Sequence, residues 1–304
     1  MFKNDPKIPI SVLMTAYNTG HVIAQTIQSI LNQSFTDFEF VIVNDGSTDN
    51  TEDVIFSFND SRIVYLSNSK NKGIVYSANK GVENCRGKYI CRMDSDDICH
   101  KNRLKLQYRF MEKTPQCIAS SAHYKKIKGS KITSSSKHYF QKKDKEIRVE
   151  MLRNAPIAQG CAIIRRELFE EHEVRYDEDY LYCEDYEFWR QAMKYGSLHI
   201  LNRPLLYYRQ HEGQVTRKHT VIQVENANKI RESLIKEIVP EISNNELRVH
   251  LALMTDLNSR EGISTEDFCR WVDKACLLNS VKKCYDVKLF NRLMYKRLKR
   301  LLRD

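Results

Sequence analysis

The segment FEFVIVNDGSTDNT, residues 38–51, joins a run of apolar and β-branched residues to a polar turn. The run favours a buried strand, and the turn formers at positions 44–47 end it. Thr48 or Asp49 is then placed to cap the helix predicted by NTEDVIFSF, residues 50–58. A buried strand followed directly by a helix is one unit of a parallel α/β sheet.

The same alternation runs through the first hundred residues. It predicts further strands at 10–18, 62–68 and 88–94, and helices at 21–34 and 73–87. Three polar turns follow predicted strands: TAYN at 15–18, NDGSTD at 44–49 and DSDD at 94–97. In open parallel sheets ligands bind beyond the carboxyl ends of the strands. We therefore expect these three turns to line one crevice.

The rest of the chain changes character. Residues 116–150 are rich in Lys and Ser and predict a pair of short strands or a loop. Residues 155–171 predict a strand and then a helix, and residues 182–196 an amphipathic helix with an acidic start, as the helix dipole favours. From about residue 217 the pattern is helical to the end.

Composition narrows the classes of protein. With 41% hydrophobic and 29% charged residues in 304, the chain has an ordinary globular balance. The net charge of +10 favours an anionic partner, such as a nucleotide, a nucleic acid or a lipid surface. The acidic crevice and the lack of basic–aromatic interleaving speak against nucleic acid.

Localisation follows from two further observations. No apolar run approaches the ~18 residues of a membrane-spanning helix, and MFKNDPKIPI lacks the apolar region of a signal peptide. The nine cysteines are scattered, with no C-x-x-C pair, which predicts reduced thiols. We expect a cytoplasmic protein.

The DSDD turn carries the clearest chemistry. Asp94, Asp96 and Asp97 crowd into four positions, and their charges repel one another. An Asp-x-Asp at a strand end can hold a divalent cation and, through it, a diphosphate. The alternative is a solvated acidic loop in which Asp97 caps the next helix.

Other turns allow nucleotide contacts but do not require them. Asp45 could accept a hydrogen bond from a base or a ribose, or simply belong to a turn. Tyr17 could stack on a base or lie at the edge of the core. Lys72 and Gly73 precede a predicted helix, whose N-terminus favours a phosphate.

Five segments taken together resemble a known family. ISVLMTAYNTG, FEFVIVNDGSTDNT, NKGIVYSANKG, RMDSDDI and CEDYEFWRQA have the order and spacing of family 2 glycosyltransferases with the GT-A fold, over roughly residues 8–215. The resemblance implies an α/β GT-A domain, with a Rossmann-like nucleotide-binding sheet, at 1–215, and the helical pattern that follows it predicts a helical C-terminal region at 216–304. It also implies inverting transfer of a sugar from a nucleotide sugar, here a UDP-sugar, to a hydroxyl with Mn²⁺ or Mg²⁺.

The resemblance also implies residues for the donor and the metal. The metal ligands are Asp96, Asp94 and His211, although His211 could instead contact the diphosphate or lie on the surface. Arg209 could contact the diphosphate or be surface charge. The positions implied for the nucleotide sugar are Thr15, Ala16, Tyr17, Asn18, Asp45, Lys72, Gly73, Asn79, Asp94 and Ser95.

On the acceptor side, the family keeps its general base where Asp185 stands, and Glu184 would orient a hydroxyl. The alternative is that both carboxylates only cap a helix. Trp189, one turn beyond Asp185, could stack on an acceptor sugar or be a core residue. Gln159 and Gly160 lie where the family shapes its acceptor pocket.

The C-terminal helix within 286–304 has an apolar stripe between basic residues. The stripe could pack on the catalytic domain or on a second subunit of a homodimer, or it could lie on an anionic membrane. The second role suits a lipid-linked saccharide acceptor in bacterial surface polysaccharide or lipooligosaccharide synthesis, at the inner face of the cell membrane.

Two rival functions remain. A sugar-phosphate nucleotidyltransferase would need a Gly-rich loop with Arg or Lys near its N-terminus, and TAYNTG is not such a loop. A nucleotide-sugar-binding partner subunit without catalysis would not need both Asp96 and Asp185. The sequence therefore favours a transferase.

Overall fold

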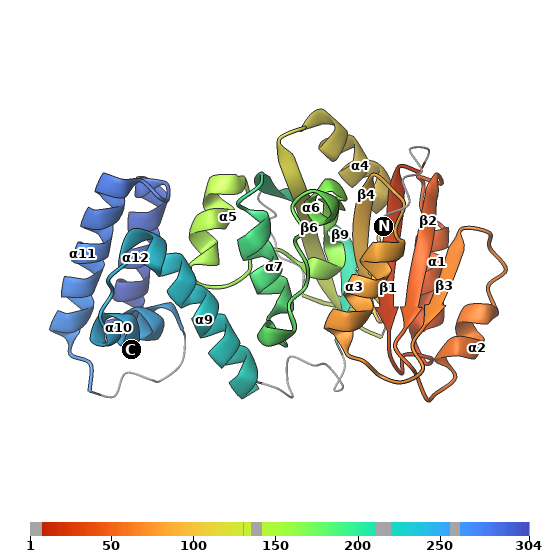
Figure 1. Cartoon of the computed structure of the whole chain (residues 1–304), viewed down its shortest axis with the longest axis horizontal. Helices are drawn as coiled ribbons and strands as arrows, with labels where there is room; N and C mark the ends of the chain where they lie inside the picture. The colour runs from red at the N-terminus through yellow and green to blue at the C-terminus, as the bar shows by residue number, and fades with distance from the viewer. Residues whose placement is uncertain (1–7, 130, 135–141, 211–219, 256–261, 304) are drawn as a thin grey trace. The chain divides into compact units, whose positions relative to one another are not determined.

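A computed structural model describes residues 8–129, 131–134, 142–210, 220–255 and 262–303 (Figure 1). Its backbone forms two compact units. Unit 1 comprises Met1–Lys142 and Ile157–His219, and unit 2 comprises Lys143–Pro156 and Thr220–Asp304. The predicted division of the chain after residue 215 stays a proposal about domain boundaries.

The first part of unit 1 alternates strands and helices as predicted. Its elements are β1 (Ile10–Ala16), α1 (Ile23–Leu31), β2 (Phe38–Asn44), α2 (Thr51–Phe56), β3 (Ile63–Ser67), α3 (Ile74–Asn84) and β4 (Tyr89–Asp94). The strands β1 to β4 are parallel to their neighbours, in the order β3-β2-β1-β4. The expectation of a parallel α/β sheet is confirmed for this half.

The second part of unit 1 extends the same sheet with mixed pairing. Its elements are β5 (Ile98–Cys99), α4 (Arg103–Lys113), β6 (Cys117–Lys128), β7 (Lys131–Ser134), η1 (Gln159–Cys161), β8 (Ile163–Arg165), α6 (Glu167–Glu170), η2 (Glu178–Tyr180), α7 (Glu184–Ala192) and β9 (Ser197–Arg209). The sheet continues β4-β8-β6-β9-β5, and β7 pairs with β6. Strand β8 is antiparallel to both neighbours, whereas β6 and β9 are parallel.

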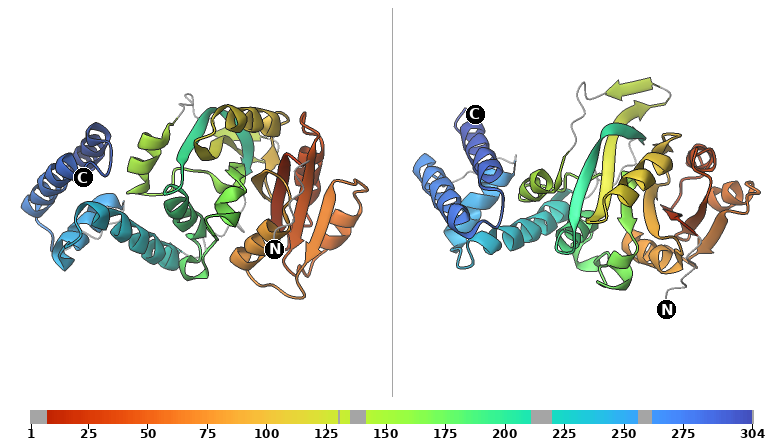
Figure 2. Two further views of the ribbon diagram at one scale, coloured as in Figure 1. Left: turned by 45° about the horizontal axis from the view of Figure 1, so that its top comes forward. Right: turned by 90° about the horizontal axis from the view of Figure 1, so that it is seen from above.

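The prediction for residues 116–150 was wrong in part. Strand β6 has 12 residues and lies inside the sheet, because its first half, CIASSA, is small and buried. Its lysines begin only at position 125, where β6 and β7 form a hairpin that stands out from the sheet (Figure 2). The same stretch also contains the helix α5 (Asp144–Met151), which begins with a capping box.

Helices cover both faces of the sheet, and side-chain alternation along the strands assigns the faces. In β1, Val12 and Met14 join Ile27 of α1 in the main hydrophobic core. Leu13 points the other way, where Gly81 of α3 comes so close that a Cβ there would lie 2.2 Å from the Leu13 side chain. The sheet is therefore buried on both sides.

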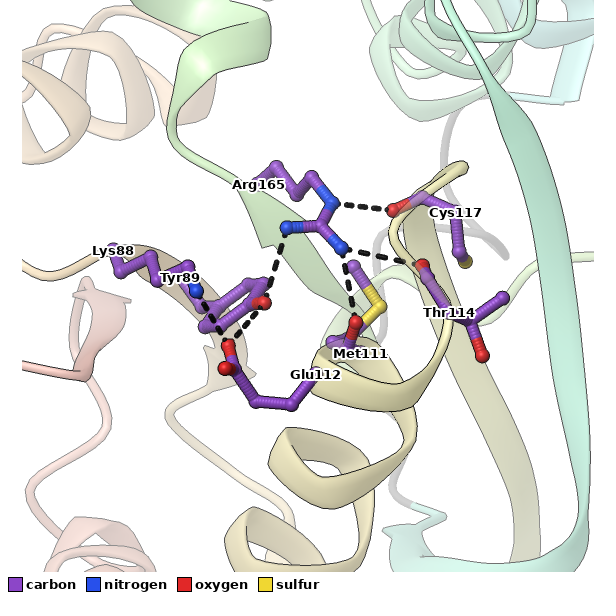
Figure 3. A network of polar contacts seen from close by, with 7 residues as sticks. All are labelled: Lys88, Tyr89, Met111, Glu112, Thr114, Cys117 and Arg165. Carbon is purple, nitrogen blue, oxygen red and sulfur yellow. Dashed lines mark hydrogen bonds and ion pairs between the residues drawn. The ribbon is translucent and has the colours of Figure 1, made fainter.

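A buried arginine fixes α4 against the sheet (Figure 3). Arg165 of β8 donates to the carbonyl of Cys117 at 2.7 Å, and to those of Met111 and Thr114 at 2.9 and 3.2 Å. A further N–H donates to the Tyr89 hydroxyl at 3.1 Å. The guanidinium thus gives a second donor to the carbonyls of Met111 and Thr114, which each already accept one backbone N–H at the end of α4.

Unit 2 is helical. It contains α5, α9 (Thr220–Ile238), α10 (Asn244–Met254), α11 (Thr265–Lys282) and α12 (Val287–Leu301). In α12, Phe290, Met294 and Leu298 are buried, and the helix packs on α11, α10 and α5. The apolar stripe of the C-terminal helix therefore packs on its own unit, and the expected homodimer stays a prediction.

The structure also bears on the cysteines and on the search for a membrane-spanning helix. The nine cysteines are all free thiols. Within the described residues, no helix combines the length and the apolar character needed to cross a membrane.

We predict that Arg165→Met lowers the free energy of unfolding of unit 1 by about 2–4 kcal/mol, because three carbonyls inside the protein each lose a donor from the guanidinium. Trp189 lies in unit 1 and Trp271 in unit 2. Urea unfolding followed by fluorescence in a Trp271→Phe background therefore reports on unit 1. The control is Arg109→Met on the exposed side of α4, where the loss should stay below about 0.5 kcal/mol. Equal losses in the two variants would contradict the role of Arg165.

Candidate active site

The carboxyl ends of β1 to β4 lie at one edge of the sheet. Strand register pairs Thr15 of β1 with Asp94 of β4, and Ala16 with Asn44 of β2. Asn44 in turn pairs with Ser67 of β3. The loops that leave these strands therefore start side by side, as the sequence predicted for its three polar turns.

The loops after β1 and β2 are bonded to each other through Asn18. Its backbone N–H donates to Ser47 Oγ at 3.0 Å, and its side-chain oxygen accepts from the Thr48 N–H at 2.8 Å. Asn18 has a φ of 50°, a left-handed conformation that Asn tolerates better than most residues. Beside it, Tyr17 exposes 45% of its surface, so its ring is open to a stacking ligand.

Asp45 organises the loop after β3. Its carboxylate accepts from the N–H groups of Lys72 and Gly73, both at 2.9 Å, and from the Asn68 side chain at 2.7 Å. Gly46 has a φ of 66°, and a Cβ there would lie 2.4 Å from the backbone of Lys70. The two loops therefore touch backbone to backbone.

The start of α3 presents a cation and an aromatic ring. Gly73, with a φ of 90°, is the N-cap of α3, and no atom lies within 4 Å of where its Cβ would be. The Lys72 ammonium lies 5.8 Å from the centre of the exposed Tyr76 ring. This helix N-terminus and its lysine suit an anionic group, as the sequence suggested.

Asp94, the last residue of β4, lies against η1. A Cβ on Gly160 would be 2.3 Å from Asp94 Oδ2, so only glycine leaves room for that carboxylate. Burial and the neighbouring Asp96 raise the pKa of Asp94. Gly160, predicted for the acceptor pocket, thus also shapes the place of Asp94.

The DSDD turn is held from two sides. The Thr26 hydroxyl of α1 lies 2.9 and 2.7 Å from the carbonyls of Ser95 and Asp97. Arg209, at the end of β9, donates its backbone N–H to Asp97 Oδ1 at 2.9 Å and its Nε–H to the Asp96 carbonyl at 2.7 Å. Arg209 therefore positions the turn, a role that the sequence did not indicate.

Asp97 is fully buried and is more than a helix cap. Burial and repulsion from Asp94 and Asp96 raise its pKa well above the usual value. Its Oδ2 atom is buried without a hydrogen-bond partner among the described residues. The turn therefore crowds three carboxyl groups together, and one of their buried oxygens has no donor among the described residues.

Two carboxylates of α7 face the same region as Asp94. Burial raises the pKa of Asp185 to about 6, and the Asp94 charge adds to the rise, although the Tyr186 N–H opposes it by donating to Asp185 at 2.7 Å. Burial and the adjacent Asp185 raise the pKa of Glu184 to about 7. Both residues keep part of their surface exposed, whereas the Oε2 atom of Glu184 is buried and has no hydrogen-bond partner among the described residues.

Tyr176, which no sequence pattern indicated, connects these parts. Its hydroxyl accepts from the Gln159 side chain, and its ring stacks on Phe188 of α7 at 4.8 Å. Asn79 of α3 bonds its backbone on both sides, at 2.8 and 3.1 Å. Burial raises its pKa, and the charges of Asp185, Glu184 and Asp94 add to the rise. No local pattern marks this tyrosine, because its partners come from three distant segments.

Two further predicted site residues are Trp189 and His211. Trp189 is fully buried and meets Phe188 edge-to-face at 5.0 Å. The alternative of a core residue therefore holds, and its ring offers no face to an acceptor sugar. His211 lies outside the described residues.

The acidic turn suits a divalent cation. Carboxylate oxygens are hard ligands of the kind that Mg²⁺ and Mn²⁺ take, and Asp97 Oδ2 is a buried oxygen without a donor. In the part of the chain that the structure describes, no three His, Cys, Asp or Glu side chains are arranged to hold a metal ion by themselves.

Known proteins resemble this chain in sequence. The model of the family "Glycosyl transferase family 2" matches residues 11–173. An uncharacterised glycosyltransferase of Haemophilus influenzae is 32% identical over 231 residues, which cover 73% of this chain and 72% of that protein. The Escherichia coli protein UDP-Glc:alpha-D-GlcNAc-diphosphoundecaprenol beta-1,3-glucosyltransferase WfaP is 31% identical over 209 residues, covering 68% of this chain and 79% of its own.

Solved structures agree on the fold. A crystal structure of S. aureus TarS 1-349 in complex with UDP-GlcNAc has a TM-score of 0.63 at 18% identity, and covers 95% of this chain and 91% of that one. The chain belongs to glycosyltransferase family 2 and is a transferase. The expected GT-A fold with C-terminal helices is confirmed.

We predict that Gly160→Ala lowers the rate of glycosyl transfer about 100-fold, because the added methyl group displaces the Asp94 carboxylate. Steady-state kinetics and a thermal unfolding midpoint should be measured together. Gly129→Ala is the control: it adds a methyl group where nothing lies within 4 Å, at a glycine with a φ of 58°. The control can lose stability but should keep its rate. A Gly160→Ala enzyme with wild-type kinetics would show that Asp94 tolerates displacement.

Proposed function

We propose that this chain is an inverting, metal-dependent glycosyltransferase that moves a hexose or N-acetylhexosamine from a UDP-sugar to a hydroxyl of a saccharide acceptor. One observation carries the proposal. Asp94 and Asp185 come from different elements, yet their charges interact, and the pKa of Asp185 is raised to about 6. A carboxylate with that pKa is suited to accept a proton near neutral pH.

The donor is proposed from the site and from relatives. The name of WfaP specifies UDP-Glc, and TarS was crystallised with UDP-GlcNAc. In this chain the edge of the sheet offers Tyr17 for a base and the N-terminus of α3, with Lys72, for an anionic group. A uridine diphosphate sugar has a base, a ribose and two phosphates that suit these features.

The acceptor is proposed as a lipid-linked saccharide of bacterial surface polysaccharide or lipooligosaccharide synthesis. The name of WfaP specifies a saccharide on diphosphoundecaprenol. Such an acceptor lies at a membrane, so the enzyme would act at the cytoplasmic face of the cell membrane. Gln159, Gly160 and Glu184 would contact this acceptor, with its hydroxyl between Asp94 and Asp185; the closeness of Gly160 to Asp94 and the interaction of Glu184 with Asp185 support this.

The chemistry is a single displacement. The acceptor hydroxyl gives its proton to Asp185 as its oxygen attacks the anomeric carbon, and the bond from that carbon to the diphosphate breaks on the opposite face. Glu184, with a pKa of about 7, can donate or accept a hydrogen bond to a sugar hydroxyl. A divalent cation held at Asp94 and Asp96 would offset the charge of the departing nucleoside diphosphate.

We predict that Asp185→Asn lowers kcat/KM by about 1,000-fold or more while leaving the affinity for UDP within about twofold. In the wild type, kcat/KM should fall about tenfold per pH unit below pH 6, because protonated Asp185 cannot accept a proton. Release of UDP from UDP-glucose and UDP-GlcNAc is the assay for both. Asp179→Asn, at an exposed aspartate shortly before α7, should behave as wild type. Turnover retained in Asp185→Asn would refute its role as the base.

We predict that Asp96→Ala removes the part of UDP affinity that depends on Mn²⁺. Calorimetric titration of UDP with and without Mn²⁺ measures that part directly. The matched control is Asp37→Ala, an exposed aspartate just before β2 and so at the other end of the strands. If Mn²⁺ strengthens UDP binding equally in all three proteins, Asp96 is not a ligand.

A further inference from the structure

The outer face of α12 is densely basic. Six cations on this helix and its end are exposed: Lys288, Arg292, Lys296, Lys299, Arg300 and Arg303. At about 100° per residue they fall within an arc of roughly 120°. No acidic residue occurs from 287 to 303. The charge on this face is therefore not neutralised within the helix.

The opposite side of α12 is locked into unit 2, which fixes the direction of the basic face. Phe290, Met294 and Leu298 are buried. Arg297, on the same side, donates to the carbonyls of Leu253 and Thr255, both at 2.8 Å. The helix therefore cannot turn its apolar stripe outward without unfolding the unit, so a membrane could not bind it through that stripe.

Exposed apolar side chains adjoin this face. Asp273, Leu277 and Val281 form one row along α11 at a spacing of four residues, and Leu277 and Val281 expose 66% and 73% of their surface. The Tyr295 hydroxyl of α12 donates to Asp273 at 2.9 Å and so joins the row to α12. Tyr295 and Leu302 of α12 are themselves half exposed.

We propose that this surface docks on an anionic phospholipid bilayer. We define the α12 surface as the six cations together with Leu277, Val281, Tyr295 and Leu302. Its cations would lie among the headgroups, where each contributes to the attraction. Leu277 and Val281 would reach the boundary of the acyl chains, and tyrosine is common at that depth.

The combination of cations and exposed apolar side chains favours an anionic bilayer as the partner of the α12 surface. Nucleic acid would satisfy the cations, but it offers no apolar phase to bulky aliphatic side chains that stand in a row. An acidic protein is a third possible partner of this surface. The vesicles in the test below contain no protein, so binding to them measures attraction to lipid alone. The inference does not depend on the proposed reaction, since lipid binding is measured without any sugar.

The test uses the full chain and vesicles of phosphatidylcholine with or without phosphatidylglycerol. Cosedimentation should show binding to the anionic vesicles and little to the neutral ones. Replacing Lys288, Arg292, Lys296 and Arg300 by glutamine should weaken binding several hundredfold, at about fivefold per cation. Glutamine keeps helix propensity, and the four side chains are exposed, so the fold should hold.

A matched control removes the same charge elsewhere. Glutamine at Lys125, Lys126, Lys128 and Lys131 on the β6–β7 hairpin of unit 1 should leave vesicle binding within about fivefold of wild type, since these lysines lie outside the α12 surface. Leu277→Ser with Val281→Ser should weaken binding about tenfold or more. Deleting α12 is not a usable variant, because it would uncover the core of unit 2.

Three results would overturn the proposal. The first is equal binding to neutral and anionic vesicles, or binding to neither. The second is unchanged binding of either α12-surface variant, with circular dichroism showing the native helix content. The third is binding to a DNA duplex at physiological salt without binding to anionic vesicles, which would assign the surface to nucleic acid.

Discussion

The guanidinium of Arg103 is the interaction on which the geometry of the active site depends. It is buried, and its five N–H groups all have acceptors: Gln107 Oε1 at 2.9 Å, the Gly160 carbonyl at 2.9 Å, Met93 Sδ at 3.3 Å, and the Arg92 and Ala162 carbonyls at 2.6 and 3.2 Å. A buried cation is tolerated only when its donors are satisfied, so α4, β4 and η1 must keep one arrangement. That arrangement sets where the carboxylates lie.

The consequences pass from η1 to α7. Because the Gly160 carbonyl is bound, its Cα stays against Asp94, and Gln159 stays within reach of Tyr176. Tyr176 in turn stacks on Phe188 of α7, the helix that begins with Glu184 and Asp185. The positive charges of Arg92 and Arg103 partly offset the rise in the pKa of Asp94. Packing thus brings Asp94 and Asp185 close enough for their charges to interact.

Much of this could be predicted from sequence, and the failures have physical reasons. The β1–β4 half was predictable because each strand is an apolar run bounded by turn formers. The sequence predicted only a short strand or a loop where β6 lies, because the second half of this strand is rich in lysine, although its first half is buried. Trp189 was ambiguous because helical spacing places it near Asp185 without saying which side of the helix is covered. The structure covers it completely. Tyr176 and Arg209 act through partners far away in the chain, so no local pattern could reveal them.

The sequence by itself determined the fold class, the family and the turns that carry the acids, because strand ends, turn formers and motif order are local properties. Tertiary structure decided the rest. It decided that Asp45 organises the loop after β3, that Gly160 is needed for the place of Asp94, and that Asp185 has a pKa near 6. It also decided which side of α12 faces water. Burial and charge interaction depend on contacts between distant segments, and only the folded chain brings those segments together.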